Sequence, residues 1–380
     1  MTGRAPLAVY VHWPYCARIC PYCDFNVVRD RGRTAEKVAL VEAILADLAA
    51  QAALIGPREL VSIFFGGGTP SLMDPDAVGR LVERCRSLWP HAGPLEITLE
   101  ANPTDAEAAR FAAYAAAGVN RLSLGVQALD DAALARLGRN HDAAAARRAI
   151  EQAAKAFPRL SIDLIYARPE QSPSAWADEL RRAIAFGPEH VSPYQLTIEA
   201  GTAFDRAVRR GTLTPPGEDL AADLYDTTQA VLGAAGYEAY EVSNHARAPA
   251  ARSRHNLVYW RGEDYLGVGP GAHGRVTLEG ARWATLAPGS VADYVARVES
   301  LGLGAQSERL TVREAALERL LMGLRTVEGV ALAEIAPLAG SETAIAGLAG
   351  QGLVRVSCGR LVVTPRGRPV LDAITAAVAA

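Results

Sequence analysis

The order of hydrophobic patterns along residues 7–245 limits the possible folds more than any other feature of this chain. Short runs rich in β-branched and aromatic residues alternate there with longer amphipathic, alanine-rich segments. Repeated βα units of this kind build a parallel sheet covered by helices. We expect strands at residues 7–13, 61–65, 95–99, 121–126, 160–165, 190–197 and, as a seventh candidate, 237–242. We expect helices at residues 34–53, 75–88, 105–117, 143–156, 174–186 and 218–235. The sequence therefore predicts an α/β fold, a partial TIM barrel of six or seven units.

The alternation stops after His245, and other patterns divide the rest of the chain. Residues 246–304 are rich in glycine, proline and arginine, which predicts an irregular extension packed on the barrel. From residue 305 a helix, shorter helical runs and a hairpin pattern predict a small winged-helix-like domain that serves as a lid or docks a partner. We therefore expect three parts, residues 1–245, 246–304 and 305–380.

The charge balance excludes some classes of partner. Lys and Arg number 39 against 42 Asp and Glu, so the net charge of −3 gives no electrostatic reason to expect nucleic acid or an anionic membrane. Charged residues such as Glu42, Asp47 and Arg110 interrupt every apolar run, so we expect no transmembrane helix. The amino terminus resembles no secretory signal, and the expected location is the cytoplasm.

Three of the five cysteines crowd into the loop after the first expected strand, as Cys16, Cys20 and Cys23. Three thiolates can hold three corners of a [4Fe-4S] cube and leave the fourth iron open. An open iron can chelate the amino and carboxylate groups of S-adenosylmethionine (SAM), and an electron from the cluster can then cleave the sulfonium to a 5'-deoxyadenosyl radical. Cys85 and Cys358 stand alone in apolar surroundings, and we expect both to be small buried hydrophobic residues.

Two alternative interpretations of these motifs stay open at this point. His12 could complete a tetrahedral zinc site with the three cysteines. The glycine run at residues 66–68 would let the main chain approach a ligand, but it also fits a tight turn between a strand and a helix. It has the spacing neither of a P-loop nor of a dinucleotide-binding loop.

The residues around the cysteines, YVHWPYCARICPYCDF at positions 10–25, resemble the radical SAM enzymes. More closely, the chain resembles the oxygen-independent coproporphyrinogen III oxidase family. The resemblance continues through FGGGTPSL at 65–72, LEANP at 99–103, SLGVQ at 123–127 and DLIY at 163–166. With the carboxyl-terminal domain it covers nearly the whole chain and implies the partial (β/α)6-type barrel of radical SAM proteins.

Three features place the resemblance in the HemW-like haem chaperone branch of that family. The oxidases have a further cysteine where this chain has Phe25, and they have a longer segment before the cluster cysteines. The motif HNxxYW at residues 255–260 is characteristic of the chaperones. The resemblance thus implies a protein that binds haem and transfers it to haem-protein acceptors, with membranes reached only through those acceptors.

The alternative within the family is an oxidase that decarboxylates coproporphyrinogen III to protoporphyrinogen IX. The resemblance leaves open whether the chain is an enzyme, and we assign no catalytic residue. An electron donor is implied if radical chemistry occurs.

The resemblance also implies nine residues that hold SAM. Glu100, Gln127, Arg139 and Asp163 match positions that bind its polar groups, and the residues near the nucleoside or the amino group are Tyr10, Tyr22, Gly67, Gly68 and Thr69. For each of them the alternative is an ordinary polar residue or turn residue at the end of a strand.

His255 is the candidate haem ligand, because a neutral imidazole can bind haem iron. Its alternative role is to cap a turn, and His273 is a weaker candidate of the same kind. The family form D-L-I-Y-G-L-P-G-Q is changed here at Ala167 and Arg168, so we do not carry over the second SAM site of some oxidases. The remaining histidines near these motifs are expected to be structural, namely His91, His141, His190 and His245.

Overall fold

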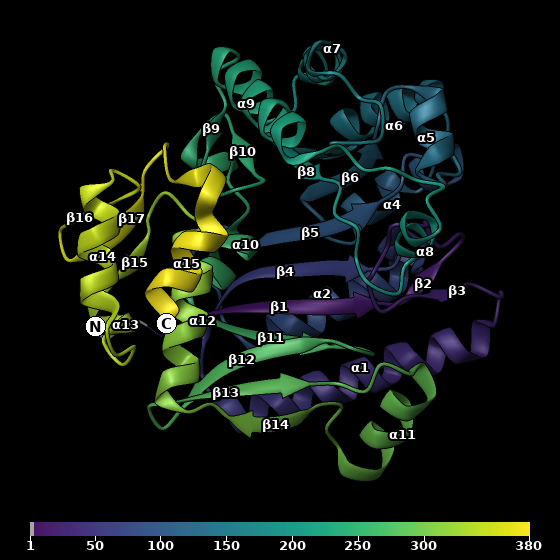
Figure 1. The fold of residues 1–380 in the computed structure, drawn as a ribbon. Coiled ribbons are helices and arrows are strands. Elements are labelled where there is room, and N and C mark those ends of the chain that lie inside the picture. Colours follow the sequence, from purple (N-terminus) through teal and green to yellow (C-terminus); the bar gives the residue numbers. More distant parts are fainter. Residues whose placement is uncertain (1–3) are drawn as a thin grey trace.

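The computed structural model describes residues 4–380, which form one twelve-stranded sheet, surrounding helices and a small carboxyl-terminal domain (Figure 1). Six neighbouring strands at the centre of the large sheet are parallel. They are β1 (Pro6–Trp13), β4 (Glu59–Gly67), β5 (Glu96–Ala101), β6 (Arg121–Gln127), β7 (Arg159–Tyr166) and β8 (His190–Gln195). The six expected strands are therefore confirmed, and so is the α/β fold class.

Helices connect or follow these strands, and all but α5 and α8 lie in the segments that the sequence pattern indicates. The side chains of Asp74, Asp142 and Ser172 accept a main-chain N–H at the start of three of them. The helices are α1 (Thr34–Ile55), α2 (Pro75–Leu88), α3 (Asp105–Ala108), α4 (Phe111–Ala116), α5 (Asp131–Arg136), α6 (Ala143–Ala156), α7 (Pro173–Ile184), α8 (Ala203–Arg209) and α9 (Glu218–Ala234). The single helix expected at 105–117 is thus two short ones. The chain turns between them at Arg110, whose guanidinium donates to the carbonyls of Ser71 and Met73.

Alternate residues of the central strands face opposite environments. Val9, Ile63 and Leu99 belong to the main hydrophobic core, with apolar side chains of the helices. Their neighbours Tyr10 and Glu100 face the other side, where they line a cavity. This period-two alternation gives the sheet one apolar face for packing and one face that carries polar groups.

The prediction of a seventh parallel strand at 237–242 is wrong. That segment contributes only β9 (Glu238–Ala239), which pairs antiparallel with β10 (His245–Ala246), and β10 pairs antiparallel with β8. The physical reason is the short connection between β9 and β10. A parallel pair needs a long crossover, whereas a short turn joins antiparallel strands.

The prediction that residues 246–304 are irregular is also wrong. β11 pairs parallel with β1, and β12, β13 and β14 continue the sheet in antiparallel order. The elements of this part are α10 (Arg254–Arg261), β11 (Asp264–Val268), β12 (His273–Leu278), β13 (Ala281–Leu286), α11 (Val291–Leu301) and β14 (Gln306–Arg309). Several of its glycines occupy tight turns between regular elements, whereas Gly267 and Gly274 lie within β11 and β12. Glu279 and Gly280, for example, both have positive φ in the two-residue turn that joins β12 to β13.

The carboxyl-terminal domain has the order of elements of a winged helix and a hydrophobic core of its own. Its elements are α12 (Val312–Leu324), β15 (Val330–Ala331), α13 (Leu332–Ile335), α14 (Ser341–Gly350), β16 (Val354–Ser357), β17 (Arg360–Val363) and α15 (Leu371–Ala379). Cys358 lies exposed in the turn between β16 and β17, so the prediction that it is buried is wrong, whereas Cys85 is buried as expected. The division of the chain into three domains stays a prediction.

This domain lies beyond the amino ends of β1 and β4, away from the carboxyl ends where β2 (Tyr15–Cys16) and β3 (Val28–Arg29) are found (Figure 1). Arg319 Nη1 donates to the carbonyl of Trp260 at 3.0 Å, which ties α12 to α10. A lid over loops at the carboxyl ends of the strands is therefore not the role that this position supports.

Helix α1 is long and apolar enough to cross a membrane, judged by length and composition alone. In the structure its residues Leu40, Ile44 and Leu48 pack in the main core. Asp47 is buried on the same helix and accepts hydrogen bonds from Tyr294 Oη at 2.7 Å and from Gly304 N at 3.0 Å. These contacts identify α1 as a core helix in this fold.

Candidate functional site

A cavity of about 490 Å³ lies inside the curved sheet and opens at the carboxyl ends of the strands. The three predicted cluster cysteines, the nine predicted SAM residues and the candidate haem ligand all line it: Tyr10, Cys16, Cys20, Tyr22, Cys23, Gly67, Gly68, Thr69, Glu100, Gln127, Arg139, Asp163 and His255. Most of them meet because the carboxyl ends of parallel strands converge on one edge of a sheet, whereas His255 comes from α10. Their individual roles stay predictions.

The three cysteines lie on a loop that the short parallel pair β2 and β3 closes. Asp30 N donates to the Cys16 carbonyl at 2.8 Å, and Cys23 N donates to the Cys20 carbonyl at 3.2 Å. Burial raises the pKa of the Cys16 thiol to about 11, and the nearby Cys23 and Cys20 thiols add to the rise. One buried thiol, Cys16, and two half-buried thiols, Cys20 and Cys23, lie around one cavity. They are a donor set that suits iron, since iron ions stabilise the thiolate form.

His12 does not supply the fourth ligand of a zinc site. One ring nitrogen is 3.0 Å from Tyr10 Oη, the other is 2.8 Å from the Asn26 carbonyl, and the side chain is outside the cavity lining. Within residues 4–380, moreover, no three His, Cys, Asp or Glu side chains are grouped as one metal ion requires. A tetrahedral zinc site therefore has no geometric support.

Arg139 reaches from the turn after α5 to the cysteine loop. Its Nη1 lies 3.3 Å from Cys20 Sγ and 3.3 Å from Tyr22 Oη, while Nη2 donates to the Gly125 carbonyl at 3.0 Å and to Asn102 Oδ1. Its buried Nε has no hydrogen-bond partner among the residues that the structure describes. A buried cation with a free N–H beside the cluster loop suits the carboxylate of a bound ligand.

Asn102 was not predicted as a site residue, although it directly follows a strand in the LEANP motif. Its Oδ1 accepts from Arg139, and its Nδ2 donates to Thr69 Oγ1 at 3.1 Å. The Thr69 hydroxyl in turn lies 3.6 Å from Cys16 Sγ. Asn102 thus links the cation to the cysteine loop. Sequence reasoning missed further lining residues on four elements and one turn, including Phe64, Arg121, Ser123, Ser192, Tyr194, Asn244 and Tyr259.

The glycine run at the end of β4 is required by packing against the chain itself. A Cβ on Gly67 would lie 2.6 Å from His12 Cε1, and one on Gly68 would lie 2.7 Å from the Pro14 carbonyl oxygen. Gly67 also has φ +111°, which other residues adopt only with strain. Close packing against His12 and Pro14 therefore requires glycine at both positions. Contact of these glycines with a ligand stays a prediction.

Gln127, at the end of β6, combines backbone strain with an unmet hydrogen-bonding group. Its φ is +65°, in the left-handed region, and its buried Oε1 has no partner. Strained residues with unpaired polar atoms concentrate where a ligand binds. The geometry of Gln127 fits a role in holding a polar ligand.

Two carboxylates and one guanidinium share the interior of the cavity. Burial raises the pKa of Glu100 to about 8, with a further contribution from the nearby charge of Asp163. Burial also raises the pKa of Asp163, which accepts hydrogen bonds from Ser123 Oγ at 2.9 Å and Ser161 Oγ at 3.1 Å. Arg121 is only 2% exposed, and its Nε has no partner. The interior therefore suits a polar or cationic guest.

We expect Glu100 to make the stability of the protein fall as pH rises from about 4.5 to about 8. Its pKa is higher in the folded chain than its ordinary value of 4.5, so the folded state binds the extra proton in this window and loses it toward pH 8. Asp163, Arg121, Tyr10 and Tyr194 face the same space. Thermal unfolding of Glu100→Gln should show a flatter pH dependence than the wild type. Parallel curves for the two proteins would contradict this assignment.

His255 lies on α10, which closes the amino end of the cavity. Its Nδ1 is 2.9 Å from Ser62 Oγ and its Nε2 is 2.5 Å from Tyr259 Oη. Burial lowers its pKa to about 3, so the ring is neutral. Both ring nitrogens are engaged, and ligation of iron would require one of these bonds to break. The haem-ligand role of His255 stays a prediction that this geometry does not favour.

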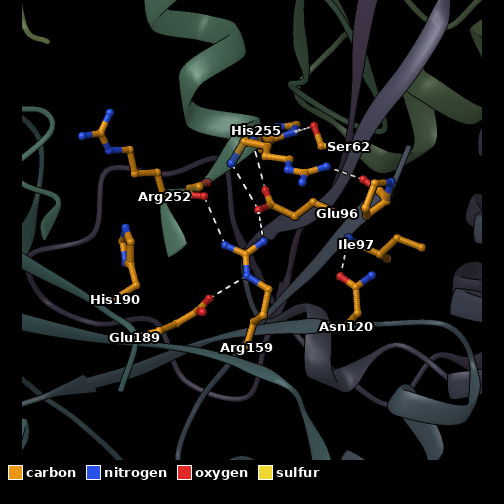
Figure 2. A network of polar contacts seen from close by, with 12 residues as sticks. Ser62, Glu96, Ile97, Asn120, Arg159, Glu189, His190, Arg252 and His255 are labelled. Atoms are coloured by element: carbon orange, nitrogen blue, oxygen red, sulfur yellow. Dashed lines mark hydrogen bonds and ion pairs between the residues drawn. The ribbon is translucent and has the colours of Figure 1, made fainter. Parts of the chain in front are cut away.

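Glu96 fixes α10 in this position, as Figure 2 shows. Its carboxylate accepts the main-chain N–H groups of Arg254 and His255 at 3.1 and 3.0 Å and pairs with Arg159 Nη1 at 2.6 Å. Arg159 also pairs with Glu189 at 2.6 Å. The first N–H groups of a helix have no acceptor within the helix, and a carboxylate that accepts two of them holds the start of the helix in place.

The other histidines and the altered loop lie outside the cavity lining. His190 bonds to Ser161 Oγ and Tyr240 Oη, each at 2.8 Å, and the exposed His273 begins β12. Ala167 has φ +57°, a conformation in which glycine would be unstrained. Arg168 forms a buried ion pair with Glu179 on α7, so the change from the family form places a salt bridge beneath the loop.

Two family models match the sequence. The radical SAM superfamily matches residues 10–183, and the HemN C-terminal domain matches residues 310–370. In three dimensions the chain is similar to the coproporphyrinogen III oxidase HemN of Escherichia coli, with a TM-score of 0.81 over 99% of this chain and 90% of that one. The sequence identity of that pair is 23%, so the likeness shows the fold alone.

Curated relatives are more similar in sequence. The heme chaperone HemW of Mycobacterium tuberculosis is 37% identical over 98% of this chain and 95% of its own length. HemW of Escherichia coli is 42% identical over 74% of this chain and 73% of its own. The mitochondrial radical S-adenosyl methionine domain-containing protein 1 of Bos taurus is 43% identical over 86% of this chain and 75% of its own.

Proposed function

The chain belongs to the radical SAM superfamily, in its HemW branch, and from this membership we propose that it is a haem chaperone that binds haem and transfers it to haem-protein acceptors. The observation that carries the proposal is the 37% sequence identity to HemW of Mycobacterium tuberculosis in an alignment that covers 98% of this chain. A match of that extent includes the cysteine loop, the sheet that forms the cavity and the carboxyl-terminal domain.

Membership in the superfamily implies a [4Fe-4S] cluster and SAM, and the cavity fits both. Cys16, Cys20 and Cys23 would hold three irons. When bound, the cluster supplies an electron to the sulfonium of SAM. Within the cavity the unpartnered Nε of Arg139 and Oε1 of Gln127 are polar groups that a ligand would satisfy.

We propose that SAM occupies the polar interior, with Glu100 and Asp163 toward its hydroxyl and ammonium groups. Arg139 lies toward its carboxylate, because the Nε–H of this cation has no acceptor in the described part of the chain and a carboxylate would supply one. Tyr10 and Tyr22 line the same space and would contact the nucleoside.

The alternative function is oxidative decarboxylation of coproporphyrinogen III. Its support is the likeness to HemN, which at 23% identity concerns the fold. Phe25 is 61% exposed at the position where the resembling oxidases have a cysteine. This difference favours the chaperone over the oxidase.

We expect the anaerobic, cluster-reconstituted protein to bind haem and to deliver it to an apo-acceptor without turning over coproporphyrinogen III. The reason is that the chain has the cluster ligands but lacks the oxidase residue at position 25. Haem titration, transfer to an apo-haem protein, and product porphyrin with 5'-deoxyadenosine are measured in parallel. Protoporphyrinogen IX formed over many turnovers would establish the oxidase instead.

Partners and location follow from the same proposal. The acceptors are haem proteins, and the chain would reach membranes only through them. An electron donor is needed only if SAM is cleaved. Relatives include bacterial proteins and proteins named as mitochondrial, and for this chain we propose the cytoplasm.

A further inference from the structure

Apolar side chains gather at the mouth of the cavity, in contrast to its interior. Ile19 is 45% exposed, Phe25 is 61% exposed and Tyr194 is 42% exposed, and all three line the cavity. Ile19 and Phe25 lie on the cysteine loop, and Tyr194 lies near the end of β8. Exposed large apolar residues that converge from two elements on one opening mark a binding surface.

The interior is a poor environment for a porphyrin ring. Glu100, Asp163, Ser123 and Ser192 line it, and a flat apolar macrocycle cannot satisfy these groups. The interior and the mouth thus differ in the ligand that each can accept, since the first suits a polar nucleoside and the second an apolar ring.

The mouth also offers a cation. Arg18 lies between Cys16 and Cys20, is exposed, lines the opening, and pairs with no carboxylate in the part of the chain that the structure describes. Asp24 and Glu199 line the same cavity and carry the opposite charge. A propionate would therefore be drawn to the Arg18 side of the opening and away from these two carboxylates.

We propose that haem binds at this mouth, against Ile19, Phe25 and Tyr194 with a propionate on Arg18, above the space that SAM occupies. This site rests on the proposed chaperone function and deepens it. It separates the haem from His255, whose ring nitrogens are already bonded to Ser62 and Tyr259. The cysteine loop then carries both the cluster and part of the haem surface.

The test is haem titration of the full-length, cluster-reconstituted protein and its variants, with iron content measured for each. We expect Phe25→Asp and Ile19→Asp each to raise the Kd for haem by about tenfold or more, because each replaces apolar contact by a charge. Arg18→Glu should weaken binding and reduce its dependence on salt.

Val312→Asp is the matched control, because Val312 is 72% exposed on α12 in the carboxyl-terminal domain and does not line the cavity. It should leave the Kd unchanged. Unchanged haem affinity in both Phe25→Asp and Ile19→Asp, with full iron content, would overturn the mouth as the site. A wild-type protein that binds no haem would overturn the proposed function itself, so the two failures are distinguishable.

Discussion

Cys20→Ala is expected to lower the iron bound after anaerobic reconstitution from about four atoms per chain to less than about one, because a cube that lacks a second corner ligand is not retained. Cys20 lies between the other two cysteines on the loop closed by β2 and β3. No further cysteine lines the cavity to replace it. Iron and sulfide analysis with the visible absorption spectrum measures the effect.

Two other cysteines provide controls for this loss. Cys85 is fully buried on α2, and Cys358 is exposed in the turn between β16 and β17. Cys85→Ala and Cys358→Ala should both retain the wild-type iron content. Four irons per chain in Cys20→Ala would show that the ligands are not those that the loop presents.

The central fold could be predicted because the pattern of each strand is local. Val9, Ile63 and Leu99 alternate with cavity residues, and this period of two is visible in the sequence. The strands β11 to β14 could not be predicted in the same way. β11 pairs with β1, which lies far from it in the sequence, so the pairing leaves no local pattern. β11 is also only five residues long, and the sequence around it lacks the βα alternation that indicated the earlier strands.

The members of the site could be predicted, but the contacts of several could not. Gly68 was expected to admit a ligand, and the structure shows that a Cβ there would lie only 2.7 Å from the Pro14 carbonyl oxygen. His255 was expected to offer a free imidazole, and Ser62, far away in sequence, occupies one of its nitrogens. A sequence motif gives the residue type at a position, whereas satisfied hydrogen bonds depend on partners from other strands.

The second large effect is expected from Glu96→Ala, which should lower the free energy of unfolding by about 3 kcal/mol, the size found when one partner of a buried ion pair is removed. The Glu96 side chain is fully buried and pairs with Arg159 at 2.6 Å. Its loss also leaves the N–H groups of Arg254 and His255 without their acceptor. Denaturant unfolding monitored by circular dichroism measures the change.

The matched control for this loss is Glu42→Ala. Glu42 pairs with Arg80 at 2.8 Å, but both side chains are more than half exposed, so the change should stay below about 0.5 kcal/mol. Arg159 keeps Glu189 as a partner in the Glu96 variant, which limits the loss. A cost for Glu96→Ala as small as that for Glu42→Ala would mean that α10 is held by its apolar packing instead.

Haem titration of the same Glu96 variant separates the two possible uses of the HNxxYW segment. Glu96 accepts the N–H groups of the first two residues of α10 (Figure 2). Through them it fixes His255, whose ring nitrogens bond to Ser62 and Tyr259. If haem binds at the mouth, the folded variant should bind it with nearly wild-type affinity despite its lower stability, because Phe25 and Arg18 are on another loop. If His255 ligates the iron, the loss of Glu96 should displace α10 and its imidazole. The affinity for haem should then fall, and the haem absorption spectrum should change.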